Sequence, residues 1–173
     1  MLLTIMLIRR LKEADHPDVA RLYCKVYGRP YHETDEPLNQ PISLHNAAYG
    51  VFLDDKLVGA VTGVTDAPRS KEDSVLFDRT HVVSYIFVDP DPRYRRRGIA
   101  ERLLATLTAV FDSSAGRIPP EKNHTISLIV EDNEASHELH EKLGFKQKRG
   151  GPLWKRTGFS HVLNPVDPPS KHI

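Results

Sequence analysis

The sequence predicts an α/β domain with a mixed β-sheet, and three observations support this fold class. The length of 173 residues suits one ordinary domain. Two nearly continuous apolar runs, residues 81–88 and 124–130, are typical of central strands that are buried on both faces. Each run is followed by a segment whose apolar residues have helical spacing, and no linker separates two cores.

The first half of the chain predicts a strand, a helix and a hairpin. Residues 1–10 are apolar and predict a strand, because the arginines follow the apolar run, whereas a secretory signal has the opposite order. Capping residues and a proline then begin a helix over 13–28. Residues 29–46 are rich in proline and acid and predict a loop, in which a short helix is an alternative. Residues 48–64 predict two strands joined through adjacent aspartates.

The second half continues the alternation of strands and helices. In order, its predicted elements are a strand over 81–88, a helix that follows Gly98, a strand over 124–130, a helix over 132–144 and a hairpin over 145–163. Residues 164–173 are rich in proline and polar residues, and they predict a flexible tail beyond a domain of residues 1–163.

Charge and cysteine content exclude several classes of function. Lys and Arg number 24 against 23 Asp and Glu, a formal charge of +1, so the surface as a whole is not built for a polyanion. Cys24 is the only cysteine, which rules out an intramolecular disulfide and a cysteine-based zinc site. His137 and His140 are three residues apart, where zincins need a full helical turn, so we predict no metal. We expect a cytoplasmic protein with neither a membrane nor a nucleic acid as partner.

An arginine-rich turn lies between the strand at 81–88 and the helix that follows. It contains Arg93, Arg95, Arg96 and Arg97. Free N–H groups and the helix dipole favour an anion at a helix N-terminus, and Gly98 lets the backbone approach it closely. The spacing matches neither a Walker loop nor the dinucleotide-binding glycine pattern. The residues favour a small phosphate ligand modestly over nucleic acid or a solvated charge run.

Two separated segments carry a family resemblance. Residues 88–104 contain the pattern Arg-x-x-Gly-x-Ala at Arg95, Gly98 and Ala100. The second segment matches Asn-x-x-Ala/Ser-x-x-Leu-Tyr-x-Lys-x-Gly-Phe at Asn133, Ser136, Leu139, Lys142, Gly144 and Phe145. In this order, each after a buried strand, they resemble the acetyl-coenzyme A loop and the following helix of the GNAT superfamily of N-acetyltransferases. The chain departs from the family at His140, where a tyrosine is usual, and in a loop two residues longer after Val88.

The resemblance implies a fold, a reaction and a binding site. The fold would be a mostly antiparallel mixed sheet with helices on both faces and two splayed central strands. The reaction would move an acetyl group from acetyl-coenzyme A (acetyl-CoA) to a primary amine of a small molecule or peptide. Backbone groups of Ile86, Phe87 and Val88 would hold the pantetheine arm, with the Val88 N–H as the oxyanion donor. The other coenzyme contacts would come from Arg95, Arg96, Arg97, Gly98, Ile99, Ala100, Asn133 and Ser136.

The catalytic groups are less defined than the coenzyme site. His140 would protonate the departing thiolate, and its alternative role is that of a helix residue without function. Regular strand alternation places Val82, Ser84, Ile86 and Val88 on one face and His81 on the other. Only Ser84 is polar on that face, where it would orient a water, while His32, Glu33 and Glu131 are loop candidates without a motif.

Two matters stay open from the sequence. Because a general base and the usual tyrosine are missing, the rival hypothesis is a catalytically silent acyl-CoA binding protein. A homodimer is one candidate assembly.

Overall fold

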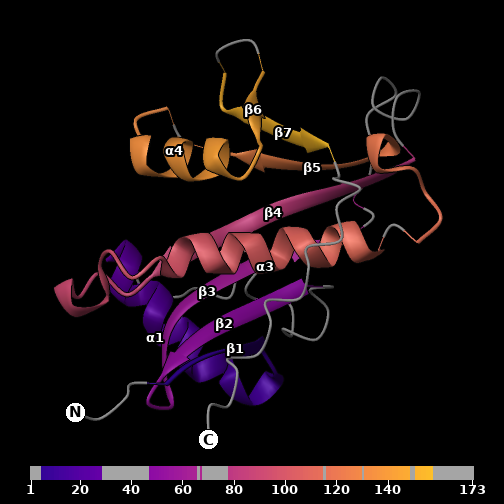
Figure 1. Ribbon diagram of the computed structural model, residues 1–173. Coiled ribbons are helices and arrows are strands. Elements are labelled where there is room, and N and C mark those ends of the chain that lie inside the picture. The colour runs from indigo at the N-terminus through magenta and orange to yellow at the C-terminus, as the bar shows by residue number, and fades with distance from the viewer. Residues whose placement is uncertain are drawn as a thin grey trace, which may run out of the picture.

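The computed structural model describes residues 5–28, 47–65, 67, 78–114, 116–129, 131–148 and 151–157. These residues form a seven-stranded sheet in the order β1-β2-β3-β4-β5-β7-β6 (Figure 1). Its strands are β1 (Met6–Arg10), β2 (Ala47–Leu53), β3 (Lys56–Val64), β4 (Arg79–Val88), β5 (Asn123–Leu128), β6 (Lys146–Gln147) and β7 (Leu153–Thr157). Only β4 and β5 run parallel, so the predicted mixed, mostly antiparallel sheet is confirmed.

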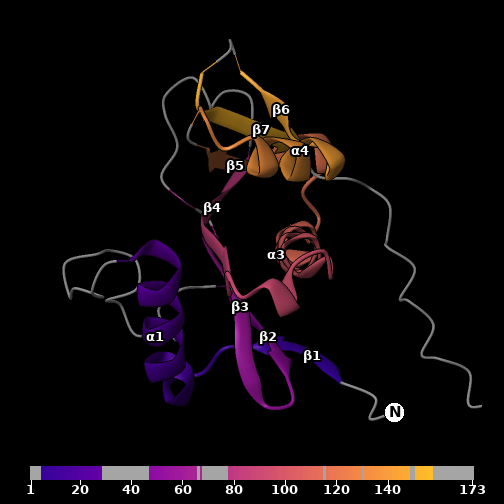
Figure 2. The same cartoon turned by 90° about the vertical axis from the view of Figure 1, so that its left-hand side faces the viewer.

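Helices cover both faces of the sheet, as predicted (Figure 2). Helix α1 (His16–Tyr27) lies on one face, and α3 (Ile99–Ser114) and α4 (Glu134–Lys142) lie on the other. Single turns of 3₁₀ helix add η1 (Glu13–Asp15), η3 (Pro92–Tyr94) and η4 (Pro120–Lys122). The predicted loop 29–46, the domain boundary at residue 163 and the tail 164–173 lie outside the described residues.

The larger core fills the space between α3 and the sheet. Leu103, Leu104 and Leu107 of α3 are fully buried there. Helix and sheet pack closely, because a Cβ added at Gly59 of β3 would lie 2.8 Å from Ile99 Cγ2, and one at Gly63 would lie 2.6 Å from Phe111 Cζ. Close packing of this kind fixes the position of the first turn of α3 relative to the central strands.

The central strands β4 and β5 separate halfway along β4. Their pairing extends from Arg79 opposite Asn123 to Val83 opposite Ser127, while β4 continues to Val88. A β-bulge at Ser84 marks the point of separation, since Val83 lies opposite Gly63 and Tyr85 lies opposite Thr62. A bulge bends and twists its strand locally. The predicted splay is therefore confirmed, and it begins at this bulge.

The bulge makes the predicted alternation of side chains along β4 wrong. Val83 belongs to the same core cluster as Val88 and Ile86, although regular alternation would put it on the opposite face. His81 faces the α3 side as well, because its ring stacks on Phe111 with centroids 4.5 Å apart. One extra residue shifts the two-residue period, so Val82 does not share a face with Ile86 and Val88.

Candidate functional site

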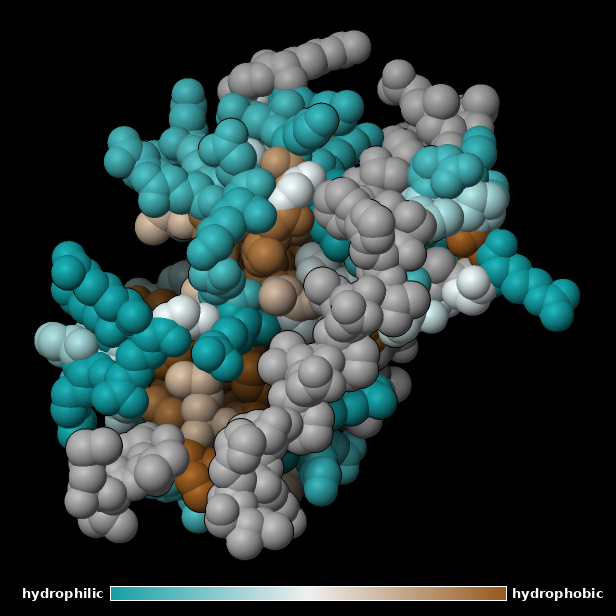
Figure 3. Space-filling model, viewed as in Figure 1, coloured by the Kyte–Doolittle hydropathy of each residue, from teal (hydrophilic) through white to brown (hydrophobic). Residues whose placement is uncertain are grey.

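A cavity of about 440 Å³ opens at the carboxyl end of β4. The end of β4, the loop after it, the first turn of α3 and one face of α4 line this cavity. The lining residues are Val88, Asp89, Pro90, Tyr94, Arg95, Arg96, Arg97, Gly98, Ile99, Ala100, Glu101, Ala135 and Leu139. Figure 3 shows hydrophilic side chains gathered at this end of the molecule, and the surface is hollowed between them and the part that carries α4.

The loop after β4 has a defined structure despite its extra length. Its residues Pro92–Tyr94 form the 3₁₀ turn η3, which Asp91 caps by accepting a hydrogen bond from Arg93 N at 3.0 Å. The Arg93 guanidinium also donates to both Asp91 oxygens, at 3.1 and 2.7 Å. These hydrogen bonds lower the pKa of Asp91 well below its usual value. Arg93 therefore stabilises the loop, whereas Arg95, Arg96 and Arg97 are exposed beside the cavity.

The backbone between Arg95 and α3 contains two residues with left-handed φ angles. Arg96 and Gly98 have φ angles of 57° and 67°, in the left-handed region. A residue with a left-handed backbone beside one with a right-handed backbone turns successive N–H groups toward one concave space. This arrangement is called a nest. The Gly98 carbonyl accepts the first helical hydrogen bond, from Arg102 N at 3.0 Å. The N–H groups of the first turn of α3 then have no partner within the helix and carry the positive end of its dipole.

Helix α4 forms the opposite wall of the cavity. Asn133 caps it by accepting a hydrogen bond from Ser136 N at 3.1 Å. The helix turns Ala135 and Leu139 toward the cavity. Lys142 of α4 forms an ion pair of 2.8 Å with Glu101 in the first turn of α3, which joins the two walls. The sequence analysis does not predict Glu101 as a site residue. The only sequence feature that indicates it is its position in the first turn of the helix.

His140 points into the protein interior and is not among the residues that line the cavity. Its side chain is 1% exposed and packs edge-on against Phe145, with ring centroids 4.9 Å apart. Its Nδ1 lies 2.7 Å from the Ser136 carbonyl oxygen, and because a carbonyl only accepts, Nδ1 must carry a hydrogen. In the described part of the chain, the buried Nε2 has no hydrogen-bond partner. Burial lowers the pKa of His140, against a smaller opposing effect of that carbonyl.

The remaining predicted site residues of β4 lie in different surroundings. Phe87 is buried in the core cluster beside α1, and Ile86 packs against the core beneath α3. The Asp89 N–H donates to Val58 O of β3 at 2.8 Å. Because successive backbone groups of a strand point to opposite edges, the Val88 N–H points to the edge that β5 has left. Ser84 is half-buried in the bulge.

Of the other candidates for a base, the two that the structure describes do not line the cavity. His81 is fully buried, and its Nε2 lies 2.8 Å from Asn123 Oδ1, which makes it part of the core. Glu131 is exposed, and His32 and Glu33 lie outside the described residues. The structure thus brings Val88 and residues 95–100 together around one cavity. The other predicted site residues do not line it; these are Ser84, Ile86, Phe87, Asn133, Ser136 and His140.

Across the described ranges, no three His, Cys, Asp or Glu side chains come together in a way that could hold a metal ion. No helix in that part of the chain is both long enough and apolar enough to cross a membrane.

Comparisons with known proteins identify the family and the fold. The Acetyltransferase (GNAT) family matches residues 16–145. The solved structure of Arabidopsis thaliana NAA60 with acetyl-CoA has a TM-score of 0.68 at 17% identity, over 88% of this chain and 99% of that chain. The ribosomal-protein-S18-alanine N-acetyltransferase of Escherichia coli has a TM-score of 0.65 at 18% identity, over 93% and 99%. Aminoglycoside N-acetyltransferase AAC(6')-Iy with CoA has a TM-score of 0.61 at 18% identity, over 84% and 90%. A search of curated protein sequences finds no match.

The fold and the family match define an acyltransferase of the coenzyme A-dependent kind. The chain belongs to the GNAT family of acetyltransferases, and its family match covers most of its length. It is an N-acetyltransferase that uses acetyl-CoA as its co-substrate.

The low pKa of His140 leads to a prediction about stability. In the unfolded chain the imidazole takes up a proton near its ordinary pKa of about 6.5, whereas burial lowers the pKa of the ring in the folded protein. The free energy of unfolding should therefore fall as the pH is lowered from about 7.5 to about 5.5. The Tm measured across this range should fall less in His140→Phe than in the wild type. An equal fall in both proteins would contradict the lowered pKa.

Proposed function

We propose that this enzyme acetylates a primary amine of a small molecule or a peptide, and that the cavity at the end of β4 holds the pyrophosphate of acetyl-CoA. The observation that carries the proposal is the nest at Arg96 and Gly98, placed directly before the free N–H groups of α3. A pyrophosphate supplies the negative charge that this backbone and the three exposed arginines favour.

Each binding residue then has a defined task. The backbone of Gly98, Ile99 and Ala100 would donate hydrogen bonds to the phosphates, and the arginines would neutralise charge from the side. The backbone of Ile86, Phe87 and Val88 would hold the pantetheine arm along the edge that β5 leaves open. Asn133 and Ser136 begin the helix that closes the site, so their contribution would come through the placement of α4.

The chemistry needs a donor for the carbonyl oxygen and a proton for the sulfur. The amine nitrogen would bond to the thioester carbonyl carbon of bound acetyl-CoA, the carbon–sulfur bond would break, and the nitrogen would lose a proton to water. The Val88 N–H would donate a hydrogen bond to the carbonyl oxygen, where negative charge develops. His140 is the predicted donor of this proton. Because its ring is buried outside the cavity lining, transfer from Nε2 to the sulfur would require both a protonated ring and a route from the ring to the cavity. Ser84 would orient a water near the amine.

The acceptor is tested most directly by measuring the free thiol released from acetyl-CoA. The solved relatives named above are described as acting on a ribosomal-protein alanine in one case and on aminoglycosides in another. The test panel should therefore contain peptides with free N-termini, amino acids and small polyamines. Thiol release that depends on one class of primary amine is the expected result. Bound acetyl-CoA without release for any amine would favour the silent acyl-CoA binding protein, for which the buried, neutral His140 is the supporting observation. The homodimer and the cytoplasmic location stay predictions.

A further inference from the structure

We propose that Asp89 is a positioning residue of the coenzyme site, which ties the loop carrying the phosphate nest to α1 and to the hairpin of β2 and β3. The inference rests on the proposed placement of the pyrophosphate in the cavity. It assigns no chemical step to Asp89, whose task is to hold the loop in the shape that binds.

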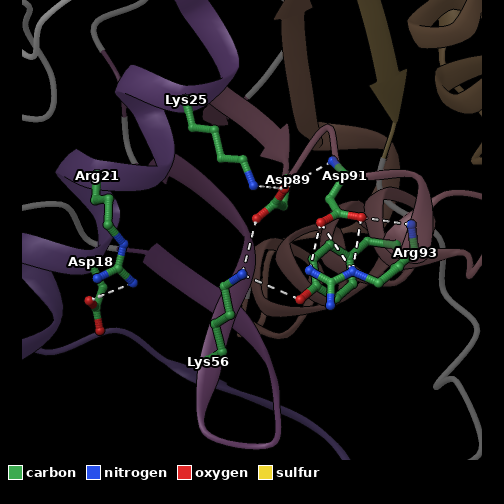
Figure 4. Close-up of polar contacts among 8 residues, drawn as sticks. Asp18, Arg21, Lys25, Lys56, Asp89, Asp91 and Arg93 are labelled. Carbon is green, nitrogen blue, oxygen red and sulfur yellow. Dashed lines mark hydrogen bonds and ion pairs between the residues drawn. The ribbon is translucent and has the colours of Figure 1, made fainter.

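The Asp89 carboxylate is the buried centre of a charged cluster (Figure 4). Its side chain is 2% exposed. Oδ1 accepts hydrogen bonds from Lys25 Nζ of α1 at 2.6 Å and from Asp91 N at 3.0 Å. Oδ2 lies 3.7 Å from Nζ of Lys56, the first residue of β3. The carboxylate therefore contacts its own loop and two elements that are far away in the sequence.

The charge of Asp89 is compensated within this cluster. Burial alone would raise the pKa of Asp89, but Lys25, the Asp91 N–H and Lys56 outweigh burial and lower it. A buried carboxylate is costly unless it is paired and hydrogen-bonded. Asp89 satisfies this requirement only while the loop, α1 and the hairpin keep their relative positions.

One of these two lysines, Lys56, also reaches the other end of the loop. Lys56 Nζ lies 3.4 Å from the Tyr94 hydroxyl and 5.3 Å from the centre of the Tyr94 ring. Tyr94 ends the turn η3 and lines the cavity directly before Arg95. The cluster thus holds the loop at Asp89, where it begins, and at Tyr94, where the nest follows.

Such a cluster matters because a loop that is already ordered loses little conformational entropy when a ligand binds. This loop is two residues longer than the usual family form, so it has more freedom to lose. Lys25 is not among the residues that line the cavity, and α1 lies on the face of the sheet opposite α3. Coenzyme affinity should therefore depend on a helix outside the cavity.

The test compares steady-state kinetics and acetyl-CoA binding in Asp89→Asn, Lys25→Met and the double variant. Asp89→Asn keeps an oxygen for the Asp91 N–H and removes the charge. Both single variants should raise Kd and KM for acetyl-CoA about ten-fold, the scale of a lost charged hydrogen bond, while kcat at saturating coenzyme stays unchanged. The double variant should be no worse than either single one, because both changes break the same contact.

A matched control lies on the same helix. Asp18 and Arg21 form an ion pair of 2.9 Å on α1 that does not reach the loop, so Arg21→Met should leave KM unchanged. If Asp89→Asn fails to fold, the Kd and KM of Lys25→Met for acetyl-CoA test the proposal alone. Wild-type KM in these variants would overturn the positioning role, provided that Gly98→Asp abolishes binding. If Gly98→Asp also binds acetyl-CoA normally, the placement of the pyrophosphate itself is wrong.

Discussion

Gly98→Asp is expected to abolish the rise in Tm that acetyl-CoA produces in the wild type. A ligand at a hundred times its Kd stabilises the native state by about 2.7 kcal/mol, which is several degrees in a protein of this size. Gly98 lies in the cavity lining with a left-handed φ of 67°. A carboxylate there would place negative charge against the pyrophosphate and fill space that the backbone leaves open.

The chain offers a closely matched control for this variant. Gly116 has φ 60°, follows the end of α3 after Ser114, and lies outside the cavity lining. A Cβ at either glycine would meet no atom within 4 Å in the described structure, so Gly116→Asp adds the same strain and charge elsewhere. Gly116→Asp should keep the full Tm rise. Equal binding by the two folded variants would place the coenzyme elsewhere.

His140→Phe is expected to lower kcat about 100-fold, the low end for general acid catalysis, and to leave the KM for acetyl-CoA unchanged. Phenylalanine keeps a ring of similar shape beside Phe145 and removes both nitrogens. The ring does not line the cavity, so coenzyme affinity should not change. His140→Tyr restores the group that is usual in the family and should retain much of the activity.

The pH profile separates proton donation from other roles of His140. A donor must be protonated, and burial lowers the pKa of His140. The rate should therefore fall as the pH rises through a value below about 6.5, and His140→Tyr should move this fall toward about 10. A fall on the acidic side carries no information, because protonation of the acceptor amine produces one as well. Undiminished activity of His140→Phe at every pH would make the histidine a bystander.

The residues around the cavity could be predicted where they are neighbours in the sequence. The phosphate turn is one example, since Gly98 and Ala100 lie within a single strand-to-helix connection, and the arginines beside them follow from the same spacing. The splay of the sheet followed from the family resemblance. Helical spacing also identified Leu139, but spacing alone does not tell whether a residue faces a core or a cavity.

What could not be predicted depends on contacts between distant segments. Asp89 reads as an ordinary loop residue until Lys25 and Lys56 are seen beside it, because they come from other elements. The burial of His140 likewise depends on Phe145 and on the placement of α4. The predicted alternation of side chains along β4 is wrong at Ser84, because a two-residue period assumes that no extra residue interrupts the ladder.

The bulge at Ser84 has a consequence for the energetics of binding. Because it turns the second half of β4 away from β5, the ladder between these strands ends at Val83. A ligand that lies along the freed edge does not need to break hydrogen bonds between the strands. The backbone from Ile86 to Val88 is therefore a sheet edge that β5 does not pair. A ligand bound there can form hydrogen bonds in the place of a neighbouring strand.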